Sequence, residues 1–538
     1  MPNQTLAEFH TADRNRSGDL SKIPPLRAQS STGLEFVVVL PENVAYYYPR
    51  EPRFTLYFTS LLHNATVTLR AEGIQLHSWQ MQAGDVEQFN LGSHLELGKS
   101  VYSDKVIQIS SNKPITVEVV GVVQNMTQSV LVLSKDQLGT NYIIPSFKEF
   151  TNTNHPLHIS DAANRERSAL RVIIVNTDQV NEVTLEGLSE TCNLTAHHSC
   201  QVYLNSQEDL VSVRAQHPVA VLLSHTCVRW RACTCRMLYT VLPPETNQPQ
   251  TFLIPSTLPW PSEDRSAVLV YNRGSTTIEA YDPNSPVLSI AGTALLYQPD
   301  FLFPLIPTGS FASCYSLRGY PNTETSAVII VRMNQTDGLR LGNDRLHSPD
   351  WQPITGTDYV SARISLDEGK NILWHVSTTV GVYHMGRFQN VWFGNPAPVL
   401  SRTPDSRGCL VTPEAFEIGL VPGGWRESVA YCKNKDLELA SFPNAAVKQQ
   451  IHSRISAEKN DSLKWVWIGM RLRLRSGKFY WLNERPLTEM DWSDGEPSQI
   501  YDRHCVTMNV EEGFDWATEH CCMDMHPVCY RGPGLLPM

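Results

Sequence analysis

Short hydrophobic runs, many of them alternating with polar residues, occupy most of the chain before residue 425. Residues 35–40 (EFVVVL) and 54–59 (FTLYFT) are β-branched and aromatic, and residues 65–70 (ATVTLR) alternate strictly, which is the pattern of β-strands. No long segment in this part has the period of an amphipathic helix. The pattern therefore predicts an all-β body over residues 31–394, preceded by a flexible polar arm over residues 1–30.

The body repeats its own sequence at intervals of roughly 100 residues. Residues 141–146 (NYIIPS) are echoed by 251–256 (TFLIPS), and residues 113–117 (KPITV) by 217–221 (HPVAV). Tandem units of many short strands predict either β-sandwich units or paired blades of a propeller. The sequence does not choose between the two, although we favour sandwiches because each unit has room for about six or seven strands.

The pattern changes after a segment rich in proline and small polar residues, which we interpret as a linker over residues 395–407. Apolar residues at helical spacing then predict a helix over residues 425–435. A second helix is predicted to begin after Asn444, which is a good N-cap. Residues 465–470 (WVWIGM) predict a buried strand. The overall prediction is a mostly β protein with an α+β domain over residues 408–531 and a short tail, 532–538.

Cysteine usage and charge indicate an extracellular protein. Six of the twelve cysteines fall in the body and six near the end of the chain, and even numbers suit disulfides in an oxidising compartment. The net charge of −10 argues against nucleic acid and anionic membranes as partners, and no apolar run is long enough to span a bilayer. No signal peptide is visible at the N-terminus, so we expect that a leader is missing from this numbering.

Seven triplets for N-glycosylation add to the expectation of a secreted glycoprotein. They begin at Asn3, Asn15, Asn64, Asn125, Asn193, Asn334 and Asn460. The sequence contains no phosphate-binding glycine loop, no Gly-x-Ser-x-Gly and no His-Glu-x-x-His motif. Because the acidic residues of the body are scattered, no glycosidase pair is suggested either. We therefore predict that the protein is not an enzyme.

Part of the body resembles the N-terminal domain of IgGFc-binding proteins. The resemblance rests on residues 224–227 (SHTC) with Cys233, on residues 242–244 (LPP), on residues 252–255 (FLIP) and on the opening residues 33–38. It extends over about residues 30–395 and implies a binding protein of mucus or body fluids, with immunoglobulin or mucin as candidate partners. In this region we expect the disulfides Cys192–Cys200, at a hairpin tip, and Cys227–Cys233.

The C-terminal part resembles the C-type lectin domain over about residues 408–531. The resemblance rests on the order of helix, strand, helix and Trp-Ile-Gly strand, followed by Glu496-Pro497 and the closing Trp and Cys residues. It implies the disulfides Cys432–Cys529 and Cys505–Cys521. Cys409 and Cys522 are then left over. They pair with each other, or one is free, or Cys409 bonds another chain.

The resemblance also raises the question of calcium. Calcium-binding members of that family use a Glu-Pro-Asn loop across a cis proline, a Glu two residues before the next Cys, and an Asn-Asp pair after the Trp. Here Ser498 replaces the Asn, and Arg503 replaces the carboxylate. Ala517 and Thr518 replace the Asn-Asp pair. Since calcium prefers six to eight oxygen ligands, we expect no cofactor. The cis state of Pro497 is expected only if the loop geometry is retained.

Two functional hypotheses follow. The first is a secreted recognition or adhesion protein of innate-immune or mucus type, which binds a glycan, glycoprotein or other protein ligand without calcium. Its contact surface would be the loop over about residues 484–501. The candidate ligand-binding residues on or beside it are Trp492, Glu496, Pro497, Ser498, Tyr501 and Asp502. The alternative is a calcium-dependent carbohydrate-binding lectin with a shifted ligand set of Glu496, Ser498, Asp502 and Asp515.

Overall fold

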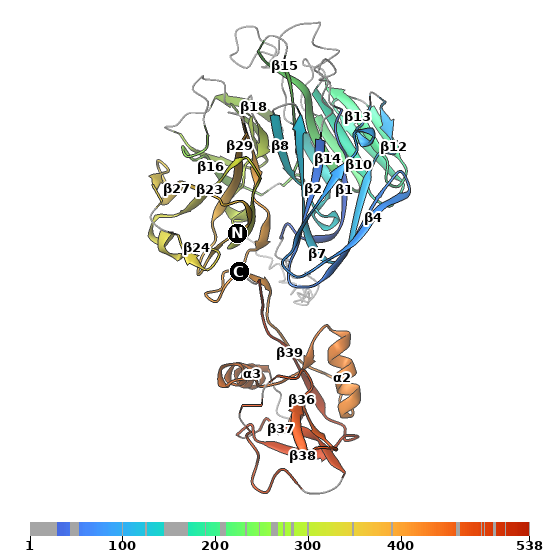
Figure 1. Ribbon diagram of the computed structural model, residues 1–538, viewed down its shortest axis with the longest axis vertical. Helices are drawn as coiled ribbons and strands as arrows, with labels where there is room; N and C mark the ends of the chain where they lie inside the picture. The colour runs from blue at the N-terminus through green and yellow to red at the C-terminus, as the bar shows by residue number, and fades with distance from the viewer. Residues whose placement is uncertain are drawn as a thin grey trace, which may run out of the picture.

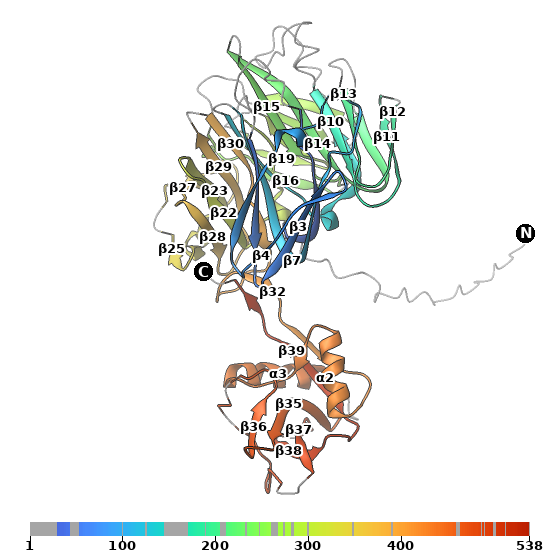
Figure 2. The same cartoon turned by 45° about the vertical axis from the view of Figure 1, so that its right-hand side comes forward.

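The computed structural model contains a large body of β-strands and a smaller C-terminal domain that lies below it (Figures 1 and 2). It describes residues 30–42, 53–98, 100–123, 126–144, 170–188, 190–204, 211–231, 234–246, 248–259, 267–272, 275–280, 285–297, 301–346, 349–388, 391–458, 463–485, 487–488, 490–498, 502–511 and 513–536. Strands predominate, as the sequence pattern predicts. None of the helices in these ranges is long and apolar enough to cross a membrane.

The strands of the body fall into four consecutive units. The first unit has β1 (Gly33–Val38), β2 (Arg53–Ser60), β3 (Ala65–Ala71), β4 (Ile74–Met81), β5 (Val86–Leu91), β7 (Ile107–Val123) and β8 (Met126–Leu131). The second has β9 (Gly139–Ile144), β10 (Leu170–Asn176), β11 (Asn181–Glu186), β12 (Glu190–Leu194), β13 (Ser199–Leu204), β14 (Val211–Arg231) and β15 (Thr234–Val241). The short β6 (Tyr102–Ser103) pairs with β13.

The third and fourth units complete the body. The third has β16 (Gln250–Leu253), β17 (Ala267–Asn272), β18 (Ser275–Ala280), β19 (Val287–Ile290), β20 (Ala294–Tyr297) and β21 (Leu302–Pro304). The fourth has β22 (Cys314–Gly319), β23 (Glu324–Arg332), β24 (Leu339–Leu341), β25 (Asp344–Arg345), β26 (Gln352–Pro353), β27 (Tyr359–Ser365), β28 (Gly369–His375), β29 (Gly381–Phe388) and β30 (Val391–Pro396). A further strand, β31 (Val399–Ser401), pairs with β22.

The first two units have the same strand order. The first sheet runs β4-β3-β7-β2-β5 and the second runs β12-β11-β14-β10-β13. Each sheet is built on one long strand, β7 or β14. The first half of β7 pairs with β1 and its second half with β2, and the first half of β14 pairs with β11 and its second half with β10. The repeated prolines, Pro114 and Pro218, lie at equivalent positions of β7 and β14. The pairing of β2 with β7 ends at Ile115, and the pairing of β10 with β14 ends at Val219, in each case one residue from the proline.

The four units close into a ring. Strand β8 lies beside β15 and β30, and β21 also lies beside β15 and β30, so the last strands of the four units surround one axis. Hydrophobic cores also bridge successive units. Tyr239 of the second unit packs into the core of the first, Leu295 of the third into that of the second, and Tyr383 of the fourth into that of the third. Because apolar burial is the main favourable term in folding, these shared cores hold the ring together.

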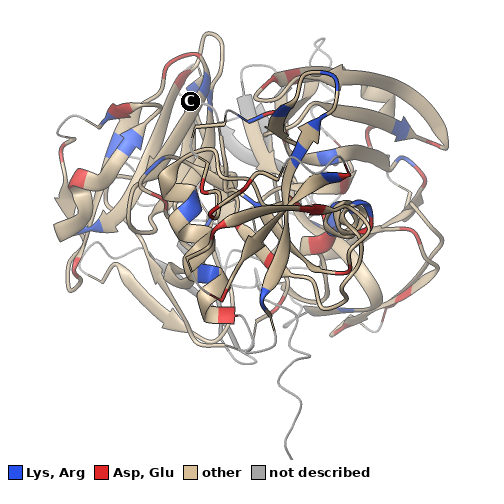
Figure 3. Cartoon of the chain, turned by 90° about the horizontal axis from the view of Figure 1, so that it is seen from below, with Lys and Arg blue, Asp and Glu red and all other residues tan. Residues whose placement is uncertain are grey.

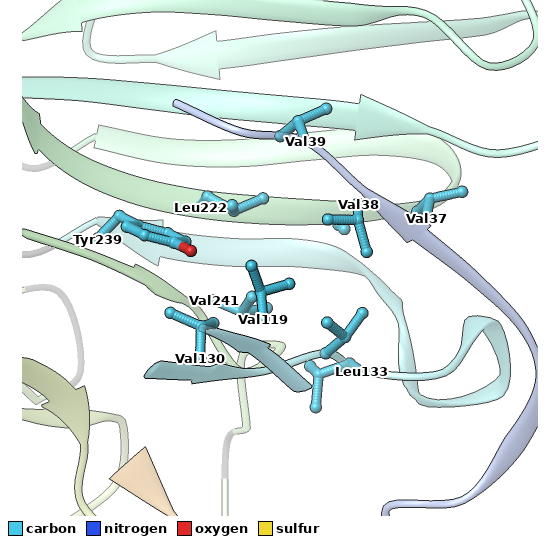
Figure 4. Close-up of a pocket in the computed structure, with 11 residues that line it drawn as sticks. Val37, Val38, Val39, Val119, Val130, Leu133, Leu222, Tyr239 and Val241 are labelled. Carbon is cyan, nitrogen blue, oxygen red and sulfur yellow. The ribbon is translucent and has the colours of Figure 1, made fainter. Parts of the chain in front are cut away.

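The contact between the first and second units is apolar. Figure 4 shows a small cavity there, lined by valines of β1, β7 and β8 together with residues of β14 and β15. Its lining includes Val38, Val119, Leu222 and Tyr239. The cavity therefore belongs to the packing between these units, and its lining offers no group of polar side chains for a ligand.

The contact that closes the ring, between the fourth and first units, contains a buried carboxyl group. Glu118 of β7 is 7% exposed and lies near Tyr57, Arg318 and Tyr320. Its Oε1 atom has no hydrogen-bond partner among the described residues. Burial raises the pKa of Glu118 to about 7, against the opposing effect of the Arg318 guanidinium.

The C-terminal domain has two helices and a mixed sheet. Its elements are β32 (Leu410–Thr412), β33 (Ala415–Ile418), α2 (Trp425–Asn434), β34 (Glu438–Leu439), α3 (Ala445–Glu458), β35 (Trp465–Arg473), β36 (Lys478–Trp481), β37 (Arg503–Asn509), β38 (Trp516–His520), β39 (His526–Arg531) and β40 (Gly534–Leu535). Helix α3 begins where predicted, because Oδ1 of Asn444 accepts a hydrogen bond from the amide of Val447 at 3.0 Å.

The junction between body and C-terminal domain differs from the sequence-based expectation. The segment expected as a linker, 395–407, includes the end of β30 and all of β31, both of which belong to sheets of the fourth unit. The segment expected as a tail, 532–538, includes β40, which pairs with β32. Both ends of the C-terminal domain therefore return to the body, as Figure 2 shows.

A disulfide also fixes this junction. Cys409 bonds Cys314 of β22, so among the alternatives left open the pair Cys409–Cys522 is wrong, and a free cysteine, Cys522, is correct. The reason is tertiary: Cys409 is buried beside Trp374 of the fourth unit and Leu61 of the first. Cys522 instead lies exposed, with a free thiol, in the turn between β38 and β39. No pattern within the C-terminal sequence signals that Cys409 packs against the body.

Candidate functional site

The loop that precedes β37 is built on an aromatic core. Trp492 lies over Phe479 of β36, with 4.8 Å between ring centroids, and against Trp516 of β38 at 6.0 Å. Trp516 is fully buried. Trp492, predicted as a ligand contact, is therefore partly buried and anchors the loop to the domain. The predicted contact Tyr501 lies outside the described residues.

Two disulfides hold the elements around this loop. Cys432 of α2 bonds Cys529 of β39, and Cys505 of β37 bonds Cys521 just after β38. Both pairs are those implied by the resemblance. In the body, Cys192 bonds Cys200 as predicted, whereas the predicted pair Cys227–Cys233 lies outside the described side chains.

The carboxylate of Glu496 is occupied by the protein itself. Its Oε2 atom accepts hydrogen bonds from the amide of Ser498 at 2.7 Å and from the amide of Thr518 at 2.9 Å. The Thr518 hydroxyl donates to the same oxygen and accepts from the Ser498 amide at 3.0 Å. The peptide bond between Glu496 and Pro497 is cis, as in the family loop.

These contacts set the ionisation of Glu496. Burial raises its pKa, but the hydrogen bonds from Thr518 and Ser498, with the nearby Arg503 guanidinium, outweigh burial and leave the pKa below its ordinary value. The group is therefore an ionised carboxylate whose charge is compensated by donors of the chain. We call Glu496, Ser498 and Thr518 the Glu496 network.

The other proposed calcium ligands are directed elsewhere. Asp502 lies 3.4 Å from Nδ1 of His520, and Arg503 pairs with Glu519 at 3.6 Å. Asp515 is exposed at the start of β38, and its backbone carbonyl accepts a hydrogen bond from Asn509. Across the described part of the chain, no three His, Cys, Asp or Glu side chains are grouped as a metal site.

This donor set fits calcium poorly. A calcium ion requires six to eight oxygens, mostly from carboxylates and carbonyls. Among the ligand positions of the family pattern, only Glu496 keeps a carboxylate, which already accepts three hydrogen bonds, and a guanidinium stands two residues before Cys505. The sequence did not reveal that Thr518 donates hydrogen bonds to Glu496. From its position after Trp516, the sequence indicated only that a calcium ligand is lost there.

Three of the candidate glycosylation sites are exposed asparagines: Asn64, Asn193 and Asn334. Oδ1 of Asn64 accepts a hydrogen bond from the amide of Ala83 at 3.1 Å. Asn193 lies on β12 and Asn334 in a turn after β23. Asn125 and Asn460 fall outside the described residues.

Comparison with known protein families identifies both parts of the chain. Residues 422–531 match the family description "Lectin C-type domain", and residues 128–295 match "IgGFc binding protein". The chain joins an IgGFc-binding domain to a C-type lectin domain. This is the pair of domains that the motifs predicted. The lectin domain is the part that carries the Glu496 network.

Individual relatives match about a fifth of this chain. C-type mannose receptor 2 from Homo sapiens is 23% identical over 110 residues, which are 20% of this chain and 7% of that protein. C-type lectin domain family 17, member A, from Homo sapiens is 27% identical over 107 residues, covering 20% of this chain and 26% of that protein. The solved structure of human lithostathine is 22% identical, with a TM-score of 0.21, and covers 22% of this chain and 92% of that one. The match thus spans a small part of the two receptors.

Proposed function

We propose that this protein is a secreted recognition protein whose lectin domain binds a glycan or protein ligand without calcium. The domain pair supports recognition as the general role. Four disulfides among the described residues suit an oxidising, extracellular compartment.

The observation that carries the calcium-free part is the Glu496 network. In a calcium site the ion gathers the loop and its neighbouring strand, and here the amides of Ser498 and Thr518 perform that task. A loop that is already held by protein donors loses little conformational entropy when a ligand binds, so its surface is preorganised.

The surface offered to a ligand is the outer side of this loop. Thr488, Met490, Asp494, Gly495 and Pro497 are exposed there. Met490, at 55% exposure, is the largest apolar side chain among them. An apolar group flanked by polar groups and backbone is the arrangement that binding surfaces commonly use. We call these five residues the loop surface.

A binding screen tests the proposal. The full chain would be applied to arrays of glycans, mucins and immunoglobulins in buffer with EDTA and in buffer with calcium. We expect the same ligands to be captured in both, and Met490→Glu to weaken capture at least tenfold. The matched control is Met333→Glu, which changes an equally exposed methionine of the fourth unit and should leave capture unchanged. Capture that requires calcium, or that falls equally in both variants, would overturn the proposal.

A further inference from the structure

The β35–β36 hairpin of the lectin domain carries an unusual concentration of positive charge. From Trp465 to Asn483 the chain has four cations, Arg471, Arg473, Arg475 and Lys478, and no Asp or Glu. The whole chain, by contrast, has a net charge of −10. The hairpin lies at the end of the molecule that Figure 3 views, where lysine and arginine residues are blue.

The strand register gathers these cations on one face. Arg471 pairs with Tyr480 and Arg473 with Lys478, so the side chains of both pairs project to the same side of the hairpin. Arg475 lies in the turn between the strands. Since alternate residues of a strand are about 6–7 Å apart, Arg471 and Arg473 are spaced by about that distance, and Arg475 follows them in the turn. We call Arg471, Arg473, Arg475 and Lys478, with Tyr480, the basic hairpin face.

The cations of this face lack acidic partners. None of the four forms an ion pair with any described residue, and Arg473, Arg475 and Lys478 are exposed. Several other cations of the same domain are paired: Lys448 with Asp491 at 2.8 Å, Lys464 with Glu511 at 3.4 Å, Arg531 with Asp436 at 2.5 Å, and Lys435 with Glu417. An unneutralised row of like charges costs electrostatic energy, and an external anion would remove that cost.

Aromatic rings position the arginines. The guanidinium of Arg473 lies 4.7 Å from the centroid of Tyr480, and that of Arg471 lies 5.4 Å from the centroid of Trp425 at the start of α2. Cation–π contacts of this kind orient the planar guanidinium and leave its N–H edge free to donate. A fixed guanidinium fork is well suited to bidentate hydrogen bonds with an oxyanion.

We infer that the basic hairpin face binds a sulfated glycan chain. The repeated sulfate groups of such a chain match a cluster of neighbouring cations, and Arg binds oxyanions through paired donors. Single-stranded nucleic acid is less well matched, because its bases usually stack on open aromatic rings. Here the rings of Tyr480 and Trp425 are covered by the guanidinium groups.

This surface is separate from the loop surface. The opposite side of the hairpin carries Leu472 and Phe479, which pair across the strands. Phe479 packs under Trp492, toward the core of the domain. The basic hairpin face therefore points away from that core. A substitution that abolishes binding at one of the two surfaces should leave binding at the other unchanged.

The test uses immobilised heparin as a sulfated glycan and the full chain. We expect wild-type protein to bind and to elute with added salt, and Arg473→Gln/Arg475→Gln/Lys478→Gln to bind at least tenfold more weakly. The matched control is Lys435→Gln/Lys464→Gln/Arg531→Gln, which removes the same charge from paired cations of the same domain and should bind within twofold of wild type. If the first triple variant does not fold, the single variant Arg475→Glu, in the exposed turn, tests the inference instead. We expect it to bind heparin at least threefold more weakly than wild type.

Three outcomes would overturn the inference. The first is wild-type protein that passes through the column unretained at physiological salt. The second is an equal weakening of the two triple variants, which would show a response to net charge only. The third is displacement by single-stranded DNA of equal charge that is as effective as displacement by soluble heparin, which would assign the face to polyanions in general. Binding that is displaced by dextran sulfate but not by neutral dextran supports the sulfated glycan.

Discussion

The backbone amide of Thr518 donates a hydrogen bond to Oε2 of Glu496, with 2.9 Å between nitrogen and oxygen. Thr518 stands at one of the two positions after Trp516 where calcium-binding relatives were expected to carry an Asn-Asp pair. The Thr518 hydroxyl donates to the same oxygen, so the side chain at this position is a hydrogen-bond donor to Glu496 where a metal ligand was expected. The loop keeps the cis peptide at Pro497 and is held by the chain.

Removing the hydroxyl of Thr518 should weaken the loop. In Thr518→Val the carboxylate of Glu496 loses one donor, and the Ser498 amide loses its second acceptor. We expect the free energy of unfolding to fall by about 1–3 kcal/mol, as for other partly buried hydrogen bonds to charged groups. Urea unfolding of the full chain, followed by tryptophan fluorescence, would measure it.

Thr507→Val is the control for that experiment. The Thr507 hydroxyl donates only to the carbonyl of Ala517, at 3.3 Å, so its loss should cost less. If Thr518→Val were as stable as the wild type, the Glu496 network would not be holding the loop.

The low pKa of Glu496 also gives a pH dependence. Its folded pKa lies below the unfolded value of 4.5, so its contribution to stability is present above that value and is lost as the pH falls through the folded pKa. We expect Glu496→Gln to lower the unfolding midpoint at pH 7, with a smaller effect at pH 3. Thermal unfolding at both values would show it, and an equal effect at both would contradict an ionised Glu496.

Glu118 should have the opposite dependence. Because burial raises its folded pKa to about 7, it favours the folded state most below the unfolded pKa of 4.5, and this contribution is lost as the pH rises through 7. Glu118→Gln mimics the neutral acid. We expect the stability of the variant relative to wild type to rise by about 3 kcal/mol between pH 4 and pH 8.

Urea unfolding over that pH range would measure the change. Glu87→Gln, an exposed position on β5 of the same unit, serves as the control and should show no such trend. His384, whose pKa burial lowers to about 4, is present in both proteins, so its titration cancels in the comparison. A constant difference between Glu118→Gln and wild type would contradict a raised pKa of Glu118 in the folded protein.

The Cys314–Cys409 bond should couple the lectin domain to the body. The two cysteines are 95 residues apart in sequence, so the chain-entropy model assigns their bond about 5 kcal/mol. In Cys314→Ser/Cys409→Ser we expect a lower unfolding midpoint and faster proteolysis between β31 and β32. Cys192→Ser/Cys200→Ser, which opens a separation of 8 residues, should cost only about 2.5 kcal/mol. Equal losses in the two variants would contradict the coupling.

The elements that local sequence determines were predictable. Asn444 caps α3 because an N-cap depends on a side chain and an amide only three residues away. The echo at Pro114 and Pro218 also indicated equivalent positions in two units. Closure of the ring was not predictable, because it depends on contacts such as that between Ser129 and Asn395, which are 266 residues apart.

The sequence predicted which residues form the candidate site but not the hydrogen bonds between them. The motif located Glu496 and Pro497, and the substitutions at Ser498, Arg503 and Thr518 indicated that calcium ligands were lost. That Thr518 supplies donors in their place depends on the distance between β38 and the loop. The sequence pattern gives no such distance.

Thermal unfolding of the full chain in millimolar calcium and in EDTA tests most directly whether the lectin domain works without calcium. We predict the same unfolding midpoint for this domain in both buffers, because the Glu496 network holds the loop without a cation. A ligand that binds the folded state would raise the midpoint by mass action. A midpoint several degrees higher in calcium, with the increase abolished by Glu496→Gln, would contradict the account.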